Sequence, residues 1–362
     1  MAFSRILIRA TNWVGDAVMS LPAIRAVRAG FPQAEIAVVA RPWVADLYAR
    51  ERSINRVIVY TGNPGWHDLG GKWRLARSLR REQFDCAILF QNAFEAAALA
   101  WLAGVPRRIG YDRDGRRALL TDAVAVPRAD EIPRHERFYY LELLRRAGLL
   151  DVLPESPSIC LDGAETAALS GARRFEQLEI APPFIGVSPG AAYGNAKRWP
   201  PERFSEAALA VAAASGGSVV LFGSSGERSL CETVAGLVRQ KGGKAYNLAG
   251  QTALREFIDL AAACEVFLTN DSGAMHIASA LGVRTVAVFG ATDDSTTGPT
   301  GPLSRVVREP VECSPCLLRE CPIDHRCMTR VTAPRVAQVA LELLRSQAVP
   351  GMPGPYERCN RT

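Results

Sequence analysis

Four short stretches of this sequence combine side chains that could do chemistry, and the first comprises residues 12–16, with the sequence NWVGD. It directly follows an apolar run at residues 6–8, which is typical of a strand buried in a parallel sheet. Asp16 then stands where a helix begins, and a carboxylate there is stabilised by the helix dipole and by free N–H groups. Asp16 is therefore either a helix cap or a general base that accepts a proton from a substrate hydroxyl.

The second stretch lies between residues 188 and 198 and carries donors that suit a phosphate. Ser188 and Gly190 can present a hydroxyl and a backbone N–H without obstruction, since glycine has no side chain. Lys197 supplies a mobile point charge that suits a diphosphate, and Arg198 adds a planar guanidinium. The other interpretation is a polar loop that ends where two prolines open a helix.

The third stretch comprises residues 270–276, with the sequence NDSGAMH. An apolar run leads into it and a helical pattern follows, so free N–H groups at the helix start predict an anion site. Asp271 can orient neighbouring amides or accept a hydrogen bond from a sugar hydroxyl, and His276 either donates to a phosphate or packs in the core. The candidate contacts to a phosphorylated donor here are Asn270, Asp271, Ser272, Gly273 and His276.

The fourth stretch gathers the cysteines Cys313, Cys316, Cys321 and Cys327, with His325 among them. Thiolate and imidazole ligands could hold a tetrahedral zinc ion. The spacing of the second cysteine pair is wider than in a standard zinc ribbon, so reduced thiols packed in an active-site loop are the favoured interpretation. No Walker loop, Asp-x-Asp motif or Ser-His-Asp arrangement stands out, which favours chemistry without a bound metal.

The composition is that of an ordinary globular protein with room for two cores, since the 362 residues are 48% hydrophobic and 22% charged. The net charge of +6 is uneven, because residues 1–150 contain 23 Lys and Arg against 15 Asp and Glu. Such a basic half favours an anionic partner: a phosphorylated substrate, a membrane surface or nucleic acid. No apolar run approaches the roughly 20 residues of a membrane span. No signal-peptide pattern opens the chain either, so we expect a cytoplasmic protein.

Apolar runs and amphipathic segments alternate along both halves of the chain, which predicts an α/β protein with parallel sheets. Strands are expected at residues 6–8, 36–39, 57–59, 87–90, 184–187, 218–222, 245–248, 266–269 and 285–289. A Pro-rich passage between the halves indicates a linker. We therefore expect two Rossmann-like, doubly wound domains, residues 1–175 and 183–346, whose strand ends face each other across a cleft, followed by a flexible tail at 347–362.

Together, these stretches resemble the ADP-heptose:lipopolysaccharide heptosyltransferases, of the heptosyltransferase II type. The resemblance rests on three blocks in the same order along the chain, at residues 12–22, at 189–191 together with 196–200, and at 270–276. The cysteine block at residues 313–328 is also similar to that family. One departure is the loop at residues 191–195, where the family more often has an acidic residue and a proline.

The resemblance implies a GT-B fold in which the N-terminal domain binds the acceptor and the C-terminal domain binds ADP-heptose. It implies transfer of L-glycero-D-manno-heptose, with inversion, onto the first heptose of the lipopolysaccharide inner core (a heptose-Kdo2-lipid A acceptor). Asp16 matches the family's proposed base, and Lys197 matches the residue that stabilises the departing diphosphate. Ser272, Gly273 and His276 match the phosphate-binding loop. The expected acceptor contacts are Asn12, Trp13, Arg107, Arg108, Arg113, Arg116 and Arg117.

We further expect an enzyme that requires no cofactor beyond its donor substrate, ADP-L-glycero-D-manno-heptose. It should act as a monomer, bind no nucleic acid and contact the anionic cytoplasmic face of the inner membrane peripherally. Two alternatives are open at this point. One is a heptosyltransferase I or a later-acting core heptosyltransferase, and the other is a non-catalytic nucleotide-binding or zinc-binding module.

Overall fold

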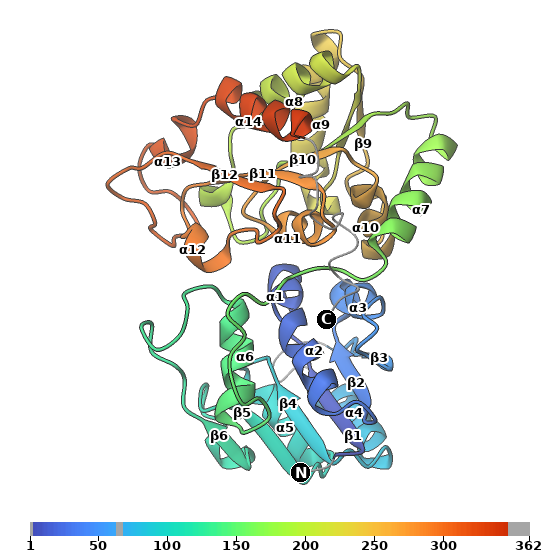
Figure 1. The fold of residues 1–362 in the computed structure, drawn as a ribbon, viewed down its shortest axis with the longest axis vertical. Coiled ribbons are helices and arrows are strands. Elements are labelled where there is room, and N and C mark those ends of the chain that lie inside the picture. The colour runs from blue at the N-terminus through green and yellow to red at the C-terminus, as the bar shows by residue number, and fades with distance from the viewer. Residues whose placement is uncertain (1–2, 63–67, 347–362) are drawn as a thin grey trace. The chain divides into compact units, whose positions relative to one another are not determined.

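The protein is described by a computed structural model over residues 3–62 and 68–346. The chain divides into two compact units, Met1–Ser158 and Ile159–Thr362 (Figure 1). The expected tail at residues 347–362 lies outside the described residues. Among those described, no helix combines the length and the apolar character that crossing a membrane requires.

The boundary between the units lies earlier than the expected end of the first domain at residue 175. The reason is helix α7 (Ala164–Gln177), which packs along helix α10 (Leu254–Ala262) of the second unit. The two helices approach closely because Gly171 has no side chain, and a Cβ atom there would clash with the carbonyl of Asp259. Helix α7 therefore belongs to the second unit.

The first unit is built on a parallel six-stranded sheet in the order β3-β2-β1-β4-β5-β6. The strands are β1 (Arg5–Arg9), β2 (Glu35–Ala40), β3 (Arg56–Val59), β4 (Cys86–Leu89), β5 (Arg107–Tyr111) and β6 (Asp122–Val124). The order reverses between β1 and β4, which makes the sheet doubly wound. In such sheets ligands bind outside the carboxyl ends of the strands at this reversal.

Within its described residues, this unit has the α-helices α1 (Val14–Met19), α2 (Leu21–Gly30), α3 (Pro42–Tyr48), α4 (Leu69–Arg81), α5 (Phe94–Leu102) and α6 (Arg137–Arg146). The single helix predicted from residue 16 is divided at Ser20, which ends α1 and begins α2. Buried side chains of β1, β4, α4 and α5 share one core, represented by Leu7, Leu89, Leu79 and Leu99. This core fixes α4 and α5 against the sheet.

The second unit repeats the same winding, with the strand order β12-β11-β10-β7-β8-β9. Its strands are β7 (Phe184–Ser188), β8 (Ser218–Leu221), β9 (Ala245–Asn247), β10 (Val266–Asn270), β11 (Arg284–Phe289) and β12 (Ser304–Arg308). Its other α-helices are α8 (Pro201–Ser215), α9 (Arg228–Gln240), α11 (Gly273–Ala280), α12 (Asp294–Thr297), α13 (Arg326–Thr329) and α14 (Ala333–Arg345). The reversal here lies between β7 and β10, the two strands that lead into the predicted phosphate-binding loops.

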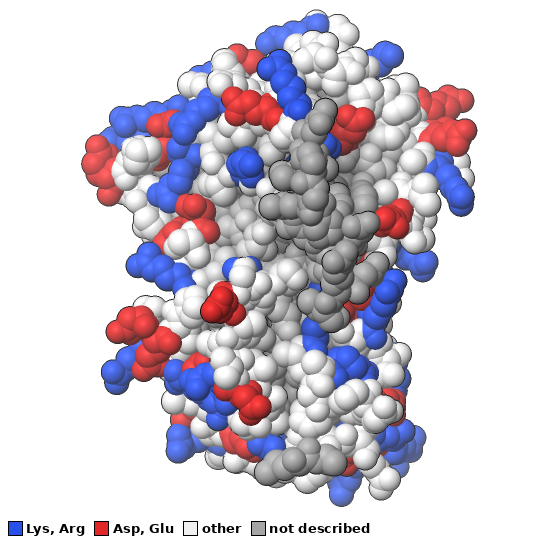
Figure 2. All heavy atoms as spheres, viewed as in Figure 1, with Lys and Arg blue, Asp and Glu red and all other residues white. Residues whose placement is uncertain are grey.

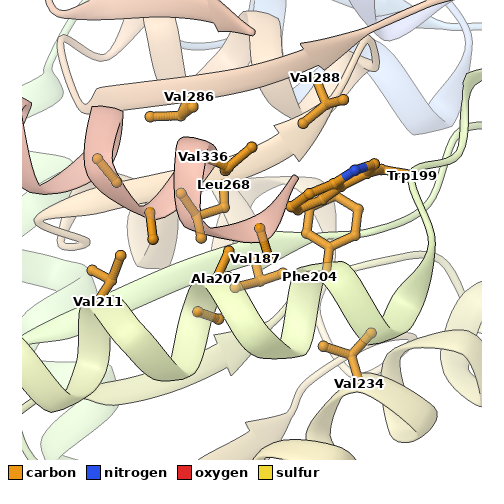
Figure 3. Close-up of a cluster of buried hydrophobic side chains, with 14 of the residues drawn as sticks. Val187, Trp199, Phe204, Ala207, Val211, Val234, Leu268, Val286, Val288 and Val336 are labelled. Atoms are coloured by element: carbon orange, nitrogen blue, oxygen red, sulfur yellow. The ribbon is translucent and has the colours of Figure 1, made fainter. Parts of the chain in front are cut away.

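Trp199 lies in the core of the second unit and is 1% exposed. Its ring packs edge-on against that of Phe204, with 4.9 Å between the ring centroids (Figure 3). Val187, Leu268 and Val286 of the sheet lie in the same cluster. The loop after β7 is thereby tied to the core at the residue that follows Arg198.

Charged side chains of both signs are interspersed over the face drawn in Figure 2. The basic excess of the N-terminal half is therefore not a uniform field on that face.

Candidate active site

The loop between β10 and α11 has the strand-loop-helix geometry that its sequence predicts. Ser272 caps α11, and its Oγ accepts a hydrogen bond from the N–H of Met275 at 3.4 Å. The same hydroxyl lies 3.1 Å from Oγ1 of Thr269, which holds the cap against the end of the strand. The start of α11 therefore presents backbone N–H groups at the carboxyl edge of the sheet, where an anion binds favourably.

Lys197 and Asp271 join the two loops at this reversal of the sheet. The Lys197 Nζ lies 2.6 Å from Oδ2 of Asp271, and Thr292 donates its hydroxyl to the same oxygen at 2.6 Å. Asp271 is only 5% exposed, and the ammonium lies 4.8 Å from the ring centroid of Tyr193. An ammonium has three donors, so Lys197 can hold this carboxylate and still donate to an anion.

Asn270 was expected to contact a donor, but the structure gives it a different role. Its side chain is fully buried, and its Nδ2 donates to the carbonyl of Pro189 at 2.8 Å. Its Oδ1 accepts from the N–H of Trp199 at 3.0 Å. Asn270 therefore fastens both ends of the loop that carries Lys197, and its amide is already satisfied.

The other predicted residues of the second unit lie around the same strand ends. Ser188 ends β7 and is buried, and His276 is buried in the first turn of α11. Arg198 donates to the carbonyl of Ala191 at 3.3 Å. Gly190 lies directly against the carboxylate of Glu227, where a Cβ atom would clash.

Glu227 is a residue of this region that the sequence did not reveal. It follows β8, and its Oε2 accepts from both the N–H and the hydroxyl of Ser224 at 2.8 Å. A Ser-x-x-Glu capping box was the available signal, although it marks a helix start and not a neighbour of Gly190.

The cysteine-rich segment supports the loop that carries Lys197. Tyr193 donates its hydroxyl to the carbonyl of Leu317 at 2.9 Å, and the N–H of Ala196 donates to the carbonyl of Arg319 at 3.0 Å. The Nε2 of His325 lies 2.9 Å from the carbonyl of Ala196. These contacts hold the segment that directly precedes Lys197 and so restrict the positions that its side chain can reach.

The four clustered cysteines are free thiols that line a cavity of about 70 Å³. Burial, together with the other three thiols, raises the pKa of Cys327 to about 11. Across residues 3–62 and 68–346, no group of three or more His, Cys, Asp or Glu side chains is arranged to hold a metal ion. The zinc hypothesis for Cys313, Cys316, Cys321 and Cys327 therefore finds no ligand set among the described residues. The interpretation as reduced thiols packed in an active-site loop stays a prediction.

Asp16 lies half-buried in the first turn of α1, at the carboxyl end of β1. Helix α3 packs on α1, and α6 packs on α2. Burial, with the charge of Asp16 as the next cause, raises the pKa of Glu136 and the pKa of Tyr140. Glu136 is thus a second carboxyl group in the field of Asp16, and no motif in the sequence pointed to it.

A cavity of about 670 Å³ opens beside the ends of β1, β2 and β4 in the first unit. Asn12 lies at its edge, where its Oδ1 accepts from Arg9 at 3.2 Å and its carbonyl accepts from Trp43 at 2.7 Å. Trp13 is 55% exposed. Asn12, Trp13 and Asp16 therefore lie on one short segment at the reversal of the first sheet.

The predicted arginine contacts are only partly available to a ligand. Arg116 is 0% exposed, and it donates to the carbonyl of Tyr111 at 2.9 Å and to Oδ1 of Asn92 at 3.1 Å. The prediction that Arg116 contacts an acceptor is wrong, because this guanidinium serves the buried polar groups around β5.

Two further arginines are also engaged within the first unit. Arg107 pairs with Asp122 at 2.9 Å, and Arg108 donates to the carbonyl of Leu119 at 2.7 Å. Arg113 and Arg117 are exposed. These two stay candidates for an acceptor contact.

The sequence matches Glycosyltransferase family 9 (heptosyltransferase) over residues 72–326. It is 33% identical over 309 residues to lipopolysaccharide heptosyltransferase 2 of Escherichia coli (strain K12), which covers 84% of this chain and 88% of that protein. It is 25% identical over 353 residues to lipooligosaccharide heptosyltransferase 2 of Campylobacter jejuni subsp. jejuni serotype O:2, a match that covers 94% of this chain and 99% of that protein.

Among solved structures, the fold is similar to the ADP-heptose lps heptosyltransferase II of E. coli, with a TM-score of 0.79 and 31% sequence identity. That match covers 94% of this chain and 98% of the other. The paired doubly wound units are thus a GT-B fold. The chain belongs to glycosyltransferase family 9, the heptosyltransferases, and is a glycosyltransferase.

Proposed function

We propose that this enzyme transfers L-glycero-D-manno-heptose from ADP-heptose, with inversion, to the first heptose of the lipopolysaccharide inner core. One observation carries the proposal: Lys197 is held by Asp271 beside the N-terminus of α11, in a chain 33% identical to a lipopolysaccharide heptosyltransferase 2. A cation and free helix N–H groups at one strand edge suit the diphosphate of a nucleotide-sugar.

The second unit binds the donor in this proposal. Negative charge develops on ADP as the bond to the sugar breaks, and Lys197 with the N–H groups of Gly273 and its neighbours stabilises that charge. Asp271 keeps the ammonium in place, since it accepts from both Lys197 and Thr292. The fixed cation needs no reorganisation at the moment of reaction. The scheme requires no cofactor beyond the donor substrate itself.

The first unit binds the acceptor. Asp16 takes the proton from the acceptor hydroxyl as this oxygen attacks the anomeric carbon, so the step is a single displacement and inverts the configuration. Asn12 and Trp13 lie on the same segment and contact the acceptor sugar. The acceptor is linked to lipid, so the enzyme works against the anionic cytoplasmic face of the membrane. It acts there as a monomer.

Defined acceptors test this assignment directly. The purified enzyme is incubated with ADP-heptose and either Kdo2-lipid A or the same acceptor that already carries one heptose. Transfer to the heptose-bearing acceptor, with a product of inverted anomeric configuration, is the expected result. Turnover on the heptose-free acceptor alone would instead identify a heptosyltransferase I.

A further inference from the structure

Helix α4 of the first unit is basic along its exposed side. It carries five cations and no acidic residue, and the exposed ones are Arg74, Arg77, Arg80 and Arg81. Its opposite side is anchored in the core through Ala76 and Leu79, which are each 2% exposed. The helix is therefore held with its arginines directed to solvent, the pattern of a helix that meets an anionic surface.

Large apolar side chains are exposed beside these arginines. Leu69 and Trp73 of α4 are 58% and 56% exposed, and Trp101 and Leu102 of the neighbouring helix α5 are 53% and 43% exposed. Helices α4 and α5 pack against each other, and Leu69, Trp73 and Leu102 line the same cavity, so the exposed side chains of the two helices form one surface. We call it the α4–α5 face, defined by Leu69, Trp73, Arg74, Arg77, Trp101 and Leu102.

The α4–α5 face is hollowed by the cavity of about 670 Å³ described above. Leu69, Trp73 and Leu102 form apolar walls, while Arg41 and Lys72 lie at the polar end. Both cations pair with the carboxylate of Glu95, Arg41 at 3.7 Å and Lys72 at 3.0 Å. The polar end therefore keeps an excess of positive charge, although its groups are mostly withdrawn from water.

Exposed tryptophan next to arginine is the chemistry of a lipid interface. The Arg77 guanidinium lies 5.1 Å from the ring centroid of Trp73, so the ring and the charge are presented together. Indole rings prefer the headgroup level of a bilayer, and juxtamembrane arginines are attracted to anionic lipids. Two copies of the α4–α5 face would oppose arginine to arginine, which disfavours a second copy of this chain as the occupant.

We propose that the α4–α5 face is the surface by which the enzyme docks on an anionic lipid bilayer. This inference rests on the proposed function, since a lipid-linked acceptor is what places the enzyme at a bilayer. Trp73, Trp101 and their apolar neighbours enter the headgroup region, and the arginines of α4 pair with lipid phosphates.

Vesicle co-sedimentation without any acceptor tests the proposal. Wild-type protein should bind vesicles of two parts phosphatidylcholine to one part phosphatidylglycerol, and bind pure phosphatidylcholine vesicles weakly. The double variants Trp73→Ser/Trp101→Ser and Arg74→Glu/Arg77→Glu should each lose about tenfold or more in affinity for the anionic vesicles. High salt should weaken wild-type binding and leave little difference between wild type and the arginine variant.

Helix α7 of the second unit provides the matched control. Leu169 is 63% exposed and Arg173 is exposed, so Leu169→Ser/Arg173→Glu changes one apolar and one basic surface group that are not part of the α4–α5 face. It should bind anionic vesicles like the wild type. All three variants should keep the wild-type melting temperature, because each replaces surface side chains.

Three results would overturn the docking surface. These are equal vesicle binding by wild type and both α4–α5 variants, no preference of the wild type for anionic vesicles, and a concentration-dependent dimer that only these variants lose. The proposed function is judged separately with a de-acylated acceptor, which needs no bilayer. Vesicle binding without heptose transfer to that acceptor would refute the function alone, while transfer without selective vesicle binding would refute the docking surface alone.

Discussion

Lys197 and Asp271 form an ion pair of 2.6 Å that links the loop after β7 to the loop after β10. The two strands are neighbours at the reversal of the second sheet, and the lysine side chain is 13% exposed. The Lys197 ammonium is therefore already positioned and partly desolvated before any substrate binds. This arrangement explains how one flexible lysine can serve as a fixed electrostatic group.

Removing the cation should slow the transfer step itself. We expect Lys197→Ala to lower kcat on the order of 10²–10³-fold and to raise the KM for ADP-heptose, because the departing diphosphate loses a pre-placed charge. Initial rates over a donor series measure both constants. Lys241→Ala, which removes an exposed lysine of the same unit, should leave both unchanged, and equal kinetics for the two variants would take Lys197 out of the mechanism.

Removing the anion should act first on stability. In Asp271→Asn the Lys197 ammonium loses its buried partner, so we expect the free energy of unfolding to fall by roughly 3 kcal/mol. Urea denaturation measures this change. Glu232→Gln breaks the exposed Arg239 pair of the same unit and should cost about 1 kcal/mol or less. A similar small cost for both variants would mean that Asp271 does not constrain Lys197.

The strands that frame these loops could be predicted because they are continuous apolar runs buried on both faces. Strands β5, β6 and β12 could not, since each has only a few apolar residues and these are flanked by charged side chains. Arg107 at the start of β5 pairs with Asp122 of β6, its neighbour in space, and also donates to the carbonyl of Ala147. A charged residue inside a strand interrupts the hydrophobic pattern by which a strand is recognised. The ion pair that makes such a residue acceptable there joins residues on different strands, so it cannot be recognised from the sequence.

The position of the site could likewise be predicted, whereas the direction of its side chains could not. Polar residues after buried strands must lie at the carboxyl edge of the sheet, which is why both Lys197 and Asp271 were expected to contact a phosphorylated donor. Asn270 and Arg116 occupy equally suggestive positions, yet both turn inward to satisfy buried carbonyl groups. Which loop supplies those carbonyls depends on tertiary packing, and no spacing rule contains that information.

The general base can be tested separately from donor binding. We expect Asp16→Asn to reduce transfer by about 10²–10⁴-fold, the usual cost of losing a positioned base. Binding of ADP, measured by calorimetry, should stay at the wild-type value because Asp16 belongs to the first compact unit. Asp130→Asn, an exposed aspartate of that unit, is the control. Weakened ADP binding in Asp16→Asn, or a loss below roughly tenfold, would argue against the assigned role.

Glu136 should make stability depend on pH. Its pKa is raised in the folded protein, mainly by burial and then by Asp16, so the folded state holds this proton more tightly than the unfolded state. The stabilisation is complete below the unfolded pKa of about 4.3 and is lost as pH rises through the folded pKa. We therefore expect Glu136→Gln to be more stable than the wild type at neutral pH, with the advantage vanishing near pH 4.

Urea unfolding at a series of pH values measures this difference for Glu136. Glu155→Gln, at an exposed glutamate, should follow the wild-type profile at every pH. A Glu136→Gln profile that runs parallel to the wild type would show that this carboxyl group is not perturbed on folding.

The clustered cysteines should differ widely in reactivity if they are packed thiols. Cys313 is exposed, whereas Cys327 is buried with its pKa raised to about 11, so only ~0.1% of it is thiolate at pH 8. We expect iodoacetamide to label Cys313 first and Cys327 last, as followed by peptide mapping over time. Cys231, whose pKa burial raises to about 12, serves as a slow internal reference. A metal shared by the four thiols predicts the opposite, because all would be protected together and released together by a chelator.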